Sequence, residues 1–340
     1  MFSGKTSQSQ GAITNICFSA FALINRQYKK QKARSFYKAR AFSVLGLSFL
    51  LCHVFVGTAY GEQQYPSRLW KIEHPKQETR PSYLLGTMHL SDKDIVNLPP
   101  HIDSVVARTD SLAIEVKLDQ KAQKSLAELS ALRGNKTLSD LIGSDTFQRI
   151  VSLLQPRGMS PLGLQRLKPW AVALMLNYPP PSLDPVLDYS LQLRFKRNKK
   201  PIYQLETAEE QIQLFDSMSV ENQVGFLMHS LVQQRHFDMY LLAMKRLYIE
   251  DDLDGLQALV NSQMDEVEQP FLQDLFRRLI EERNIKMANR MGIHLQSGNS
   301  LIAVGALHLT GNKGLIQLLR YRGYNVTPVL PFTASSVQAQ

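Results

Sequence analysis

Histidine occupies the same place in two similar segments of the chain. His89 follows Gly86 in YLLGTMHL (83–90), and His308 follows Gly305 in IAVGALHL (302–309). In each segment an apolar run typical of a buried strand precedes Gly-x-x-His-Leu. Glycine allows a sharp turn or a close approach to the backbone, and imidazole supplies a metal ligand or a general base. We therefore predict that the two histidines form one composite site; the alternative is that each only caps a strand end.

Two glutamates end other apolar runs. Glu115 lies in SLAIEV (111–116), and Glu206 ends PIYQLE (201–206). A carboxylate in a buried strand needs a charged partner, a metal ion or a place at the rim. Two histidines and Glu115 would give the three ligands and open position of a catalytic zinc site, and Glu206 as a further ligand would suit Mn or Co as well. The alternatives are a sheet-edge position for Glu115 and a place before a helix cap for Glu206.

Three more polar residues are candidates for supporting roles. Asp92 lies three residues beyond His89 and could accept a hydrogen bond from its imidazole, although an aspartate there is also typical of a helix start. Arg283 and Asn284, in EERNIKMANR, could stabilise an oxyanion, although the pattern favours a solvated helix face. We expect no other histidine of the body to be a ligand. His74 lies in a polar stretch without a partner at suitable spacing, and the others lie within helical patterns or at their ends: His101, His229, His236 and His294.

The composition excludes several classes of protein. Of 340 residues, 44% are hydrophobic and 20% charged, which is typical of a globular protein. Nearly all of the net charge of +9 comes from residues 1–61, which hold eight of the 39 Lys and Arg and no Asp or Glu. The rest of the chain has 31 basic and 30 acidic residues, so we expect no nucleic-acid partner. Both cysteines, Cys17 and Cys52, lie there too, which excludes a thiolate site further along. The motifs HExxH, GxSxG, GxGxxG and the Walker loop are absent.

Residues 1–61 have the order of an export signal. A basic stretch (26–40) precedes an apolar run (41–56), and small residues suited to cleavage follow near Ala59 and Gly61. Because the run is short for a membrane span, we expect cleavage; an uncleaved anchor, with membrane association through residues 41–60, is the alternative. In both cases the body would work outside the cytoplasm, in the periplasm or the extracellular space.

The elements that position the candidate residues form one predicted domain, 62–332, followed by a flexible tail, 333–340. Five runs have the length and apolar content of strands buried on both faces: 82–86, 111–116, 201–206, 300–305 and 324–330. Helical patterns lie between them: 99–109, 121–134, 168–178, 207–218, 219–263 as two or more helices, 268–291 and 313–323.

This alternation predicts an α/β fold with a mixed, largely parallel sheet covered by helices and a sizeable helical insert between Thr207 and Gly292. Ligands of such sheets bind where strands end. We therefore predict that the strand ends carrying His89 and His308 lie side by side.

Six segments, in the same order, resemble the TraB/GumN family, which includes bacterial pheromone-shutdown proteins and animal TIKI metalloproteases. They are YLLGTMHLSD (83–92), LAIEV (112–116), LKPWAVAL (167–174), the stretch from LDPVLD to LETAEEQ (183–211), ERNIKMA (282–288) and VGALHLTGNKGLIQLLRYRGYNV (304–326). The resemblance implies a fold akin to TIKI, erythromycin esterases and haem-binding ChaN, and metal-dependent peptide hydrolysis. The basic leader is longer than the family pattern.

The same resemblance implies roles for individual residues. His89, Glu115 and His308 match the family's ligands or catalytic residues. Arg283 and Asn284 match its Arg-Asn motif, and Glu206 its Leu-Glu-Thr glutamate.

Our leading prediction is an exported metal-dependent hydrolase, metalloprotease-like, that cleaves peptides or proteins. His89 and His308 would bind a divalent ion (Mn, Co or Zn), with Glu115 as third ligand or general base. One alternative is an envelope protein that binds a peptide or haem-like ligand without turnover. The other is a metal-free hydrolase that uses the same His and Glu residues.

Overall fold

A computed structural model describes residues 64–331, apart from Pro75, Gln77, Pro181, Leu183 and Glu266. The leader (1–61) and the tail (333–340) lie outside the described residues, so the export signal, the anchor and the flexible tail stay predictions. Within 64–331, no described helix is long and apolar enough to cross a membrane.

Six strands among the described residues form one sheet in the order β4-β3-β5-β2-β1-β6. The strands are β1 (Leu69–Glu73), β2 (Ser82–Thr87), β3 (Ser111–Ile114), β4 (Ile202–Gln204), β5 (Ser300–Gly305) and β6 (Asn325–Pro328). The neighbours β4, β3, β5 and β2 are parallel, whereas β1 is antiparallel to both β2 and β6. The predicted fold class, a mixed and largely parallel sheet covered by helices, is therefore confirmed.

The edges of the sheet differ from the prediction. The expectation that all five runs are buried on both faces is wrong for β4 and β6, whose residues are mostly intermediate or exposed. These two strands are the edges of the sheet that the described residues form. On β4, Tyr203 is 43% exposed and its ring lies against that of His294, with the ring centroids 4.6 Å apart. The sequence prediction also missed β1, where Lys71 and Glu73 interrupt the apolar run.

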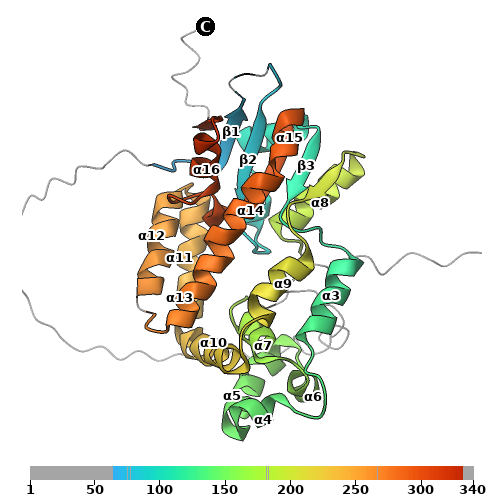
Figure 1. Cartoon of the computed structure of the whole chain (residues 1–340), viewed down its shortest axis with the longest axis vertical. Coiled ribbons are helices and arrows are strands. Elements are labelled where there is room, and N and C mark those ends of the chain that lie inside the picture. The colour runs from blue at the N-terminus through green and yellow to red at the C-terminus, as the bar shows by residue number, and fades with distance from the viewer. Residues whose placement is uncertain are drawn as a thin grey trace, which may run out of the picture.

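Helices fill the connections between the strands (Figure 1). Before β4 the helices are α1 (Lys93–Val96), α2 (Pro100–Arg108), α3 (Gln120–Ser130), α4 (Leu138–Ile142), α5 (Ser144–Leu154), α6 (Pro161–Gln165), α7 (Pro169–Leu176) and α8 (Leu187–Arg197). After β4 they are α9 (Ala208–Asp216), α10 (Val220–Gln233), α11 (Phe237–Ile249), α12 (Leu253–Asp265), α13 (Pro270–Arg277), α14 (Arg283–Arg290), α15 (Gly292–Ser297) and α16 (Leu315–Tyr321). Short 3₁₀ turns cover Gln155–Arg157, Gln234–His236 and Ala306–His308, and a π-helix covers Arg278–Glu282.

The helix boundaries follow local signals in most places. The predicted capping box before α9 is confirmed, since Thr207 and Glu210 bond each other's backbone N–H groups at 2.8 and 3.1 Å. The helix expected to end at Gly134 ends instead at Ser130. The residues after Ser130 instead pair with a segment further along the chain: Leu132 N donates to Arg166 O at 2.7 Å.

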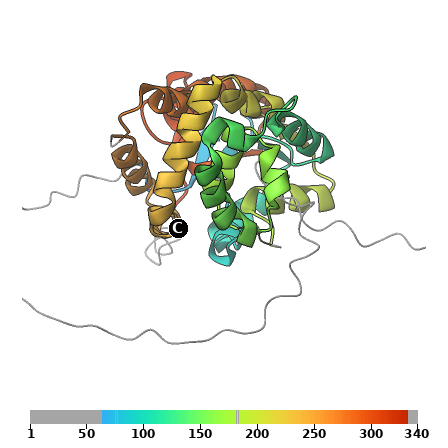
Figure 2. The same ribbon diagram turned by 90° about the horizontal axis from the view of Figure 1, so that it is seen from below.

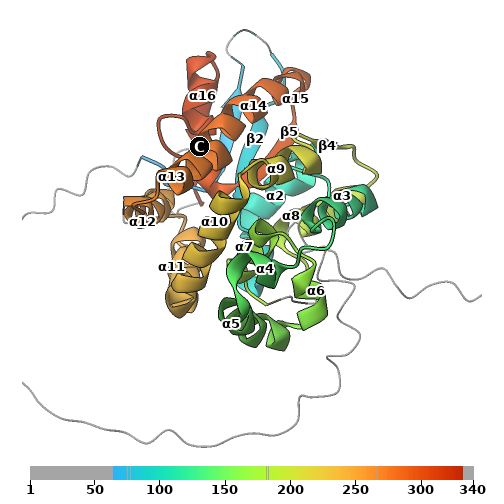
Figure 3. The same cartoon turned by 60° about the horizontal axis from the view of Figure 1, so that its bottom comes forward.

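The helical part is larger than the predicted insert. Helices α3–α7 precede β4 and helices α9–α15 follow it, and the two sets pack together through Trp170, Phe215 and Phe226, whose rings stack in series. In Figure 1, α14–α16 lie in front of the sheet, whereas α4–α7 and α10 lie beyond its lower end. The views in Figures 2 and 3 show these helices gathered around that end of the sheet.

Candidate functional site

Glu115 and Glu206 lie side by side at the carboxyl ends of β3 and β4. The pairing of the two strands continues past their last residues, and Glu206 N donates to Glu115 O at 2.7 Å. Both residues are buried, at 9% and 2% exposure. Two adjacent buried carboxylates require a counter-charge.

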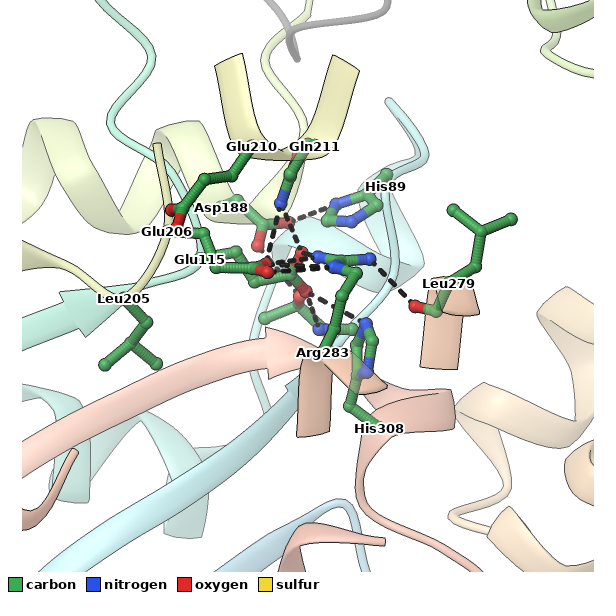
Figure 4. A network of polar contacts seen from close by, with 12 residues as sticks. His89, Glu115, Asp188, Leu205, Glu206, Glu210, Gln211, Leu279, Arg283 and His308 are labelled. Carbon is green, nitrogen blue, oxygen red and sulfur yellow. Dashed lines mark hydrogen bonds and ion pairs between the residues drawn. The ribbon is translucent and has the colours of Figure 1, made fainter. Parts of the chain in front are cut away.

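Arg283, the first residue of α14, supplies this counter-charge (Figure 4). Its Nη2 lies 2.5 Å from Glu115 Oε2 and 2.7 Å from Glu206 Oε2, and its Nε donates to Glu206 Oε2 at 2.9 Å. Its Nη1 donates to Leu279 O in the π-helix at 3.2 Å. Gln211 adds an amide donor to both glutamates, at 3.3 and 3.1 Å. The interpretation of Arg283 as part of a solvated helix face is therefore wrong: it lies buried between the carboxylates.

The charges around Glu115 keep it ionised. Burial alone would raise its pKa, but Arg283, the two histidines and the N–H of Gly305 hold it well below its usual range. The Gly305 N–H donates to Glu115 Oε1 at 2.6 Å, which ties the carboxylate to the end of β5. The reciprocal attraction raises the pKa of Arg283 above its ordinary value despite the burial of the guanidinium.

His308 ends the 3₁₀ turn after β5 and is buried. Its Nδ1 lies 2.7 Å from Asn284 Oδ1, and Asn284 Nδ2 donates to Lys313 O at 2.8 Å. Because the amide oxygen is the acceptor in this arrangement, His308 carries its proton on Nδ1 and presents the lone pair of Nε2. Burial and the nearby Arg283 lower the pKa of His308 to about 3. Asn284, fully buried, is thus a positioning residue rather than a group on an exposed face.

His89 lies in the loop after β2 and is half-buried. Its Nδ1 lies 2.8 Å from Asp188 Oδ2, and the other oxygen of Asp188 accepts from Thr87 Oγ1 at 2.8 Å. Burial would lower the pKa of His89, but Asp188 outweighs it and the pKa rises to about 9.

The acceptor predicted for His89 was the wrong aspartate. Asp92 caps α1, where its side chain accepts from Asp94 N at 2.9 Å, and it pairs with Lys245 at 2.6 Å. Asp188 on α8 takes the role instead. A signal for it was present, because Asp188 shares the helix face of the buried Leu191 and Phe195.

The three central residues converge on one point above Gly305. A Cβ at Gly305 would lie 3.3 Å from Glu115 Oε1, 3.5 Å from His308 Cδ2 and 3.9 Å from His89 Nε2. This convergence follows from β2 and β5 being neighbouring parallel strands. The prediction that the two strand ends lie side by side is confirmed. None of His74, His101, His229, His236 and His294 is among the residues that line the surrounding cavity.

The donors at this point suit a divalent ion. Each histidine has its Nδ1 bonded to a side-chain oxygen, as metal-binding histidines commonly do, and this arrangement leaves the Nε2 atoms to serve as ligands. In residues 64–331 as described, however, no three His, Cys, Asp or Glu side chains already lie close enough to hold an ion. His308 Nε2 is 3.8 Å from Glu115 Oε1, so the groups would have to draw together. Glu206, expected as a fourth ligand, instead has both oxygens bonded to Arg283.

A cavity of about 640 Å³ opens from the site into the helical part. His89, Glu115, Arg283 and His308 lie in its wall. Such a volume is ordinary for a ligand-binding pocket.

The chain belongs to the TraB/PrgY/gumN family, whose model matches residues 68–328. It is 25% identical over 246 residues to the uncharacterized protein YbaP of Shigella flexneri, a match that covers 71% of this chain and 88% of YbaP. It is 26% identical to the metalloprotease TIKI2 of Xenopus tropicalis, with 79% of this chain and 61% of TIKI2 covered. It is likewise 26% identical to the metalloprotease TIKI homolog of Nematostella vectensis, over 79% of this chain and 68% of that protein. No solved structure matches.

Proposed function

We propose that this TraB/PrgY/gumN family protein is an exported metal-dependent hydrolase of peptides or proteins. The observation that carries the proposal is the convergence of His89, His308 and Glu115 on the point above Gly305. The names of the TIKI relatives support the reaction class.

The protein's own residues would orient the reactants. His89 and His308 would hold a divalent ion through Nε2, and Glu115 would be the third ligand or would accept a hydrogen bond from the attacking water. When bound, the ion would acidify that water and polarise the substrate carbonyl. The lowered pKa of Glu115 keeps it in the charged form that either role requires. Arg283 and Gln211 fix the Glu115 side chain, and the buried position of His308 excludes bulk water from one side.

The proposal is tested with wild type and the variants His89→Ala and His308→Ala. Each protein is loaded separately with Mn, Co and Zn, dialysed, assayed for bound metal and incubated with a mixture of peptides. We expect both variants to lose bound metal and to cleave at least about 100-fold more slowly. His294→Ala is the matched control, since His294 contacts Tyr203 and does not line the described cavity. Full metal content and full cleavage in both His89→Ala and His308→Ala would refute the proposal.

A metal-free hydrolase has one specific observation in its favour, namely that Arg283 already engages Glu115. In that mechanism His308 Nε2 would take a proton from water. Its pKa of about 3 makes it a weak base at neutral pH, which favours the ligand role. Cleavage that survives exhaustive chelation, yet is lost in His308→Ala, would select the metal-free mechanism.

A further inference from the structure

Two hollows of different chemistry meet at His89. One is the cavity of about 640 Å³ described above, and the other is a groove of about 350 Å³. Four residues line both: His89, Leu90, Pro179 and Leu241. The two hollows therefore adjoin at His89.

The cavity is apolar beyond the site. Its wall includes Phe226 from α10, Phe237 and Met244 from α11, and Phe276 and Leu279 from the following helices. The charged groups in its described wall are those of the site itself, namely His89, Glu115, Asp188, Arg283 and His308. The other polar groups of the wall are neutral and include the amides of Asn177, Gln233 and Gln263 and the hydroxyls of three tyrosines. A charged substrate side chain in the deeper part of the cavity would lose its hydration without gaining a counter-ion.

The groove has a mixed lining, in which polar and charged side chains lie beside apolar ones such as Val186 and Leu242. Asp92, Asp238 and Lys245 lie in its wall with Ser91 and Ser182. Lys245 is paired with Asp92 and Asp94 at 2.6 and 2.9 Å, so its charge is already balanced. A polar segment can stay hydrated and hydrogen-bonded there.

We propose that the substrate is a peptide that lies across His89, with a large apolar side chain beside the cleaved bond in the cavity and a polar continuation in the groove. This inference rests on the proposed hydrolase function and adds the substrate class to it. The cavity decides the preference, because its wall stabilises an apolar side chain by burial and offers a charged one no counter-ion beyond the site itself.

The experiment uses a library of peptides of mixed sequence and the metal-loaded wild-type protein, with cleavage sites identified by mass spectrometry. We expect large apolar residues on one fixed side of the cleaved bond, and Asp, Glu, Lys and Arg depleted there about 10-fold or more. The residues on the other side should tolerate polar and charged types. Cleavage with no apolar preference on either side would overturn the inference while leaving the hydrolase intact.

Two methionines of α11 provide a matched pair of variants. Met244 lies in the cavity wall, whereas Met239 is 65% exposed and lines neither hollow. Met244→Glu should reduce cleavage beside apolar residues about 10-fold and raise cleavage beside Lys and Arg, a gain that misfolding cannot produce. Met239→Glu should leave the profile unchanged, and so should the conservative Met244→Leu. Identical profiles for Met244→Glu and wild type would overturn the inference.

A binding measurement separates this inference from the hydrolase proposal. If no peptide is cleaved with any metal, the hydrolase proposal fails, and the affinity of metal-free protein for two labelled hexapeptides decides the substrate class. The two peptides differ by Leu or Lys at one position. About 10-fold tighter binding of the Leu peptide, lost in Met244→Glu, supports the inference; equal binding overturns it.

Discussion

His89 and His308 reach the site by different routes. Residue for residue, β2 pairs with β5 so that Thr87, not Gly86, lies opposite Gly305. The two Gly-x-x-His segments are thus one residue out of register, and their glycines face different neighbours. An irregular loop leads from β2 to His89, whereas a 3₁₀ turn leads from β5 to His308.

The surroundings of the two imidazoles differ as much as their routes. His89 leaves 29% of its side chain exposed and has a charged partner, Asp188, whereas His308 leaves 5% exposed and has a neutral partner, Asn284, beside Arg283. An ion pair with one partly exposed member can exchange contacts with solvent, whereas a buried hydrogen-bonded pair cannot. We therefore expect the His308 side to be the rigid half of the site and the His89 side the adaptable half.

The largest effect should come from Arg283, which anchors the rigid half. Arg283→Ala would leave Glu115 and Glu206 buried without a counter-charge, at a cost of about 3–5 kcal/mol in the free energy of unfolding. Urea denaturation followed by circular dichroism measures the change. Arg290→Ala is the control, because the Arg290–Glu210 pair is partly exposed and should cost about 1 kcal/mol or less. Equal losses in the two variants would contradict the difference we draw.

The next largest effects concern the residues bonded to the two histidines, Asn284 and Asp188, whose variants should differ in their loss of stability. Asn284→Ala would leave the buried Nδ1–H of His308 unpaired and cost about 1–3 kcal/mol. Asp188→Asn keeps an acceptor for His89 or Thr87 and should cost less in stability. Both variants should bind metal about 10- to 100-fold more weakly, since each loosens a ligand. A greater stability loss for Asp188→Asn than for Asn284→Ala would reverse our assignment of the rigid half.

The register shift between the two segments is tested by replacing each of their glycines, Gly86 and Gly305, with alanine. In Gly86→Ala the new Cβ would lie 3.1 Å from the Ala306 Cα and 3.2 Å from Leu309, so the free energy of unfolding should fall by about 1–3 kcal/mol. In Gly305→Ala the new Cβ would lie 3.3 Å from Oε1 of Glu115, and this side chain can shift. We expect about 1 kcal/mol or less of destabilisation there, with at least about a 10-fold loss of cleavage. Thermal unfolding and peptide cleavage are measured on both; full activity in Gly305→Ala would contradict the placement of the reaction above that residue.

The smallest effect concerns protonation in the metal-free protein. His89 should titrate near pH 9 and His308 near pH 3, as followed by NMR of the imidazole protons. Since the folded pKa of His89 is above its unfolded value, its stabilisation is present below about pH 6.5 and is lost as the pH rises through about 9. For His308 the order is opposite: its neutral form is favoured on folding, so stability is present above about pH 6.5 and is lost as the pH falls toward 3. Two histidines that titrate together near pH 6.5 would remove the distinction between the halves.

The amino-acid sequence determined the fold class and the centre of the site. Buried parallel strands need long apolar runs, and helix caps need particular side chains; both are local patterns that β2, β5 and the Thr207–Glu210 capping box display. The repeated Gly-x-x-His segments and the glutamate of 111–116 identified the three residues that converge above Gly305.

Which side chains of the site contact one another was decided by the tertiary structure alone. Arg283 looked like a surface arginine because its neighbours along the helix are charged, yet α14 places it between two strand ends from distant parts of the chain. The same reason explains why Asp188, and not Asp92, is the partner of His89. The His89–Asp188 contact joins residues 99 positions apart, whereas sequence spacing constrains only residues on the same element. Register is the third such decision, since a one-residue offset between β2 and β5 made two nearly identical segments into unlike halves of one site.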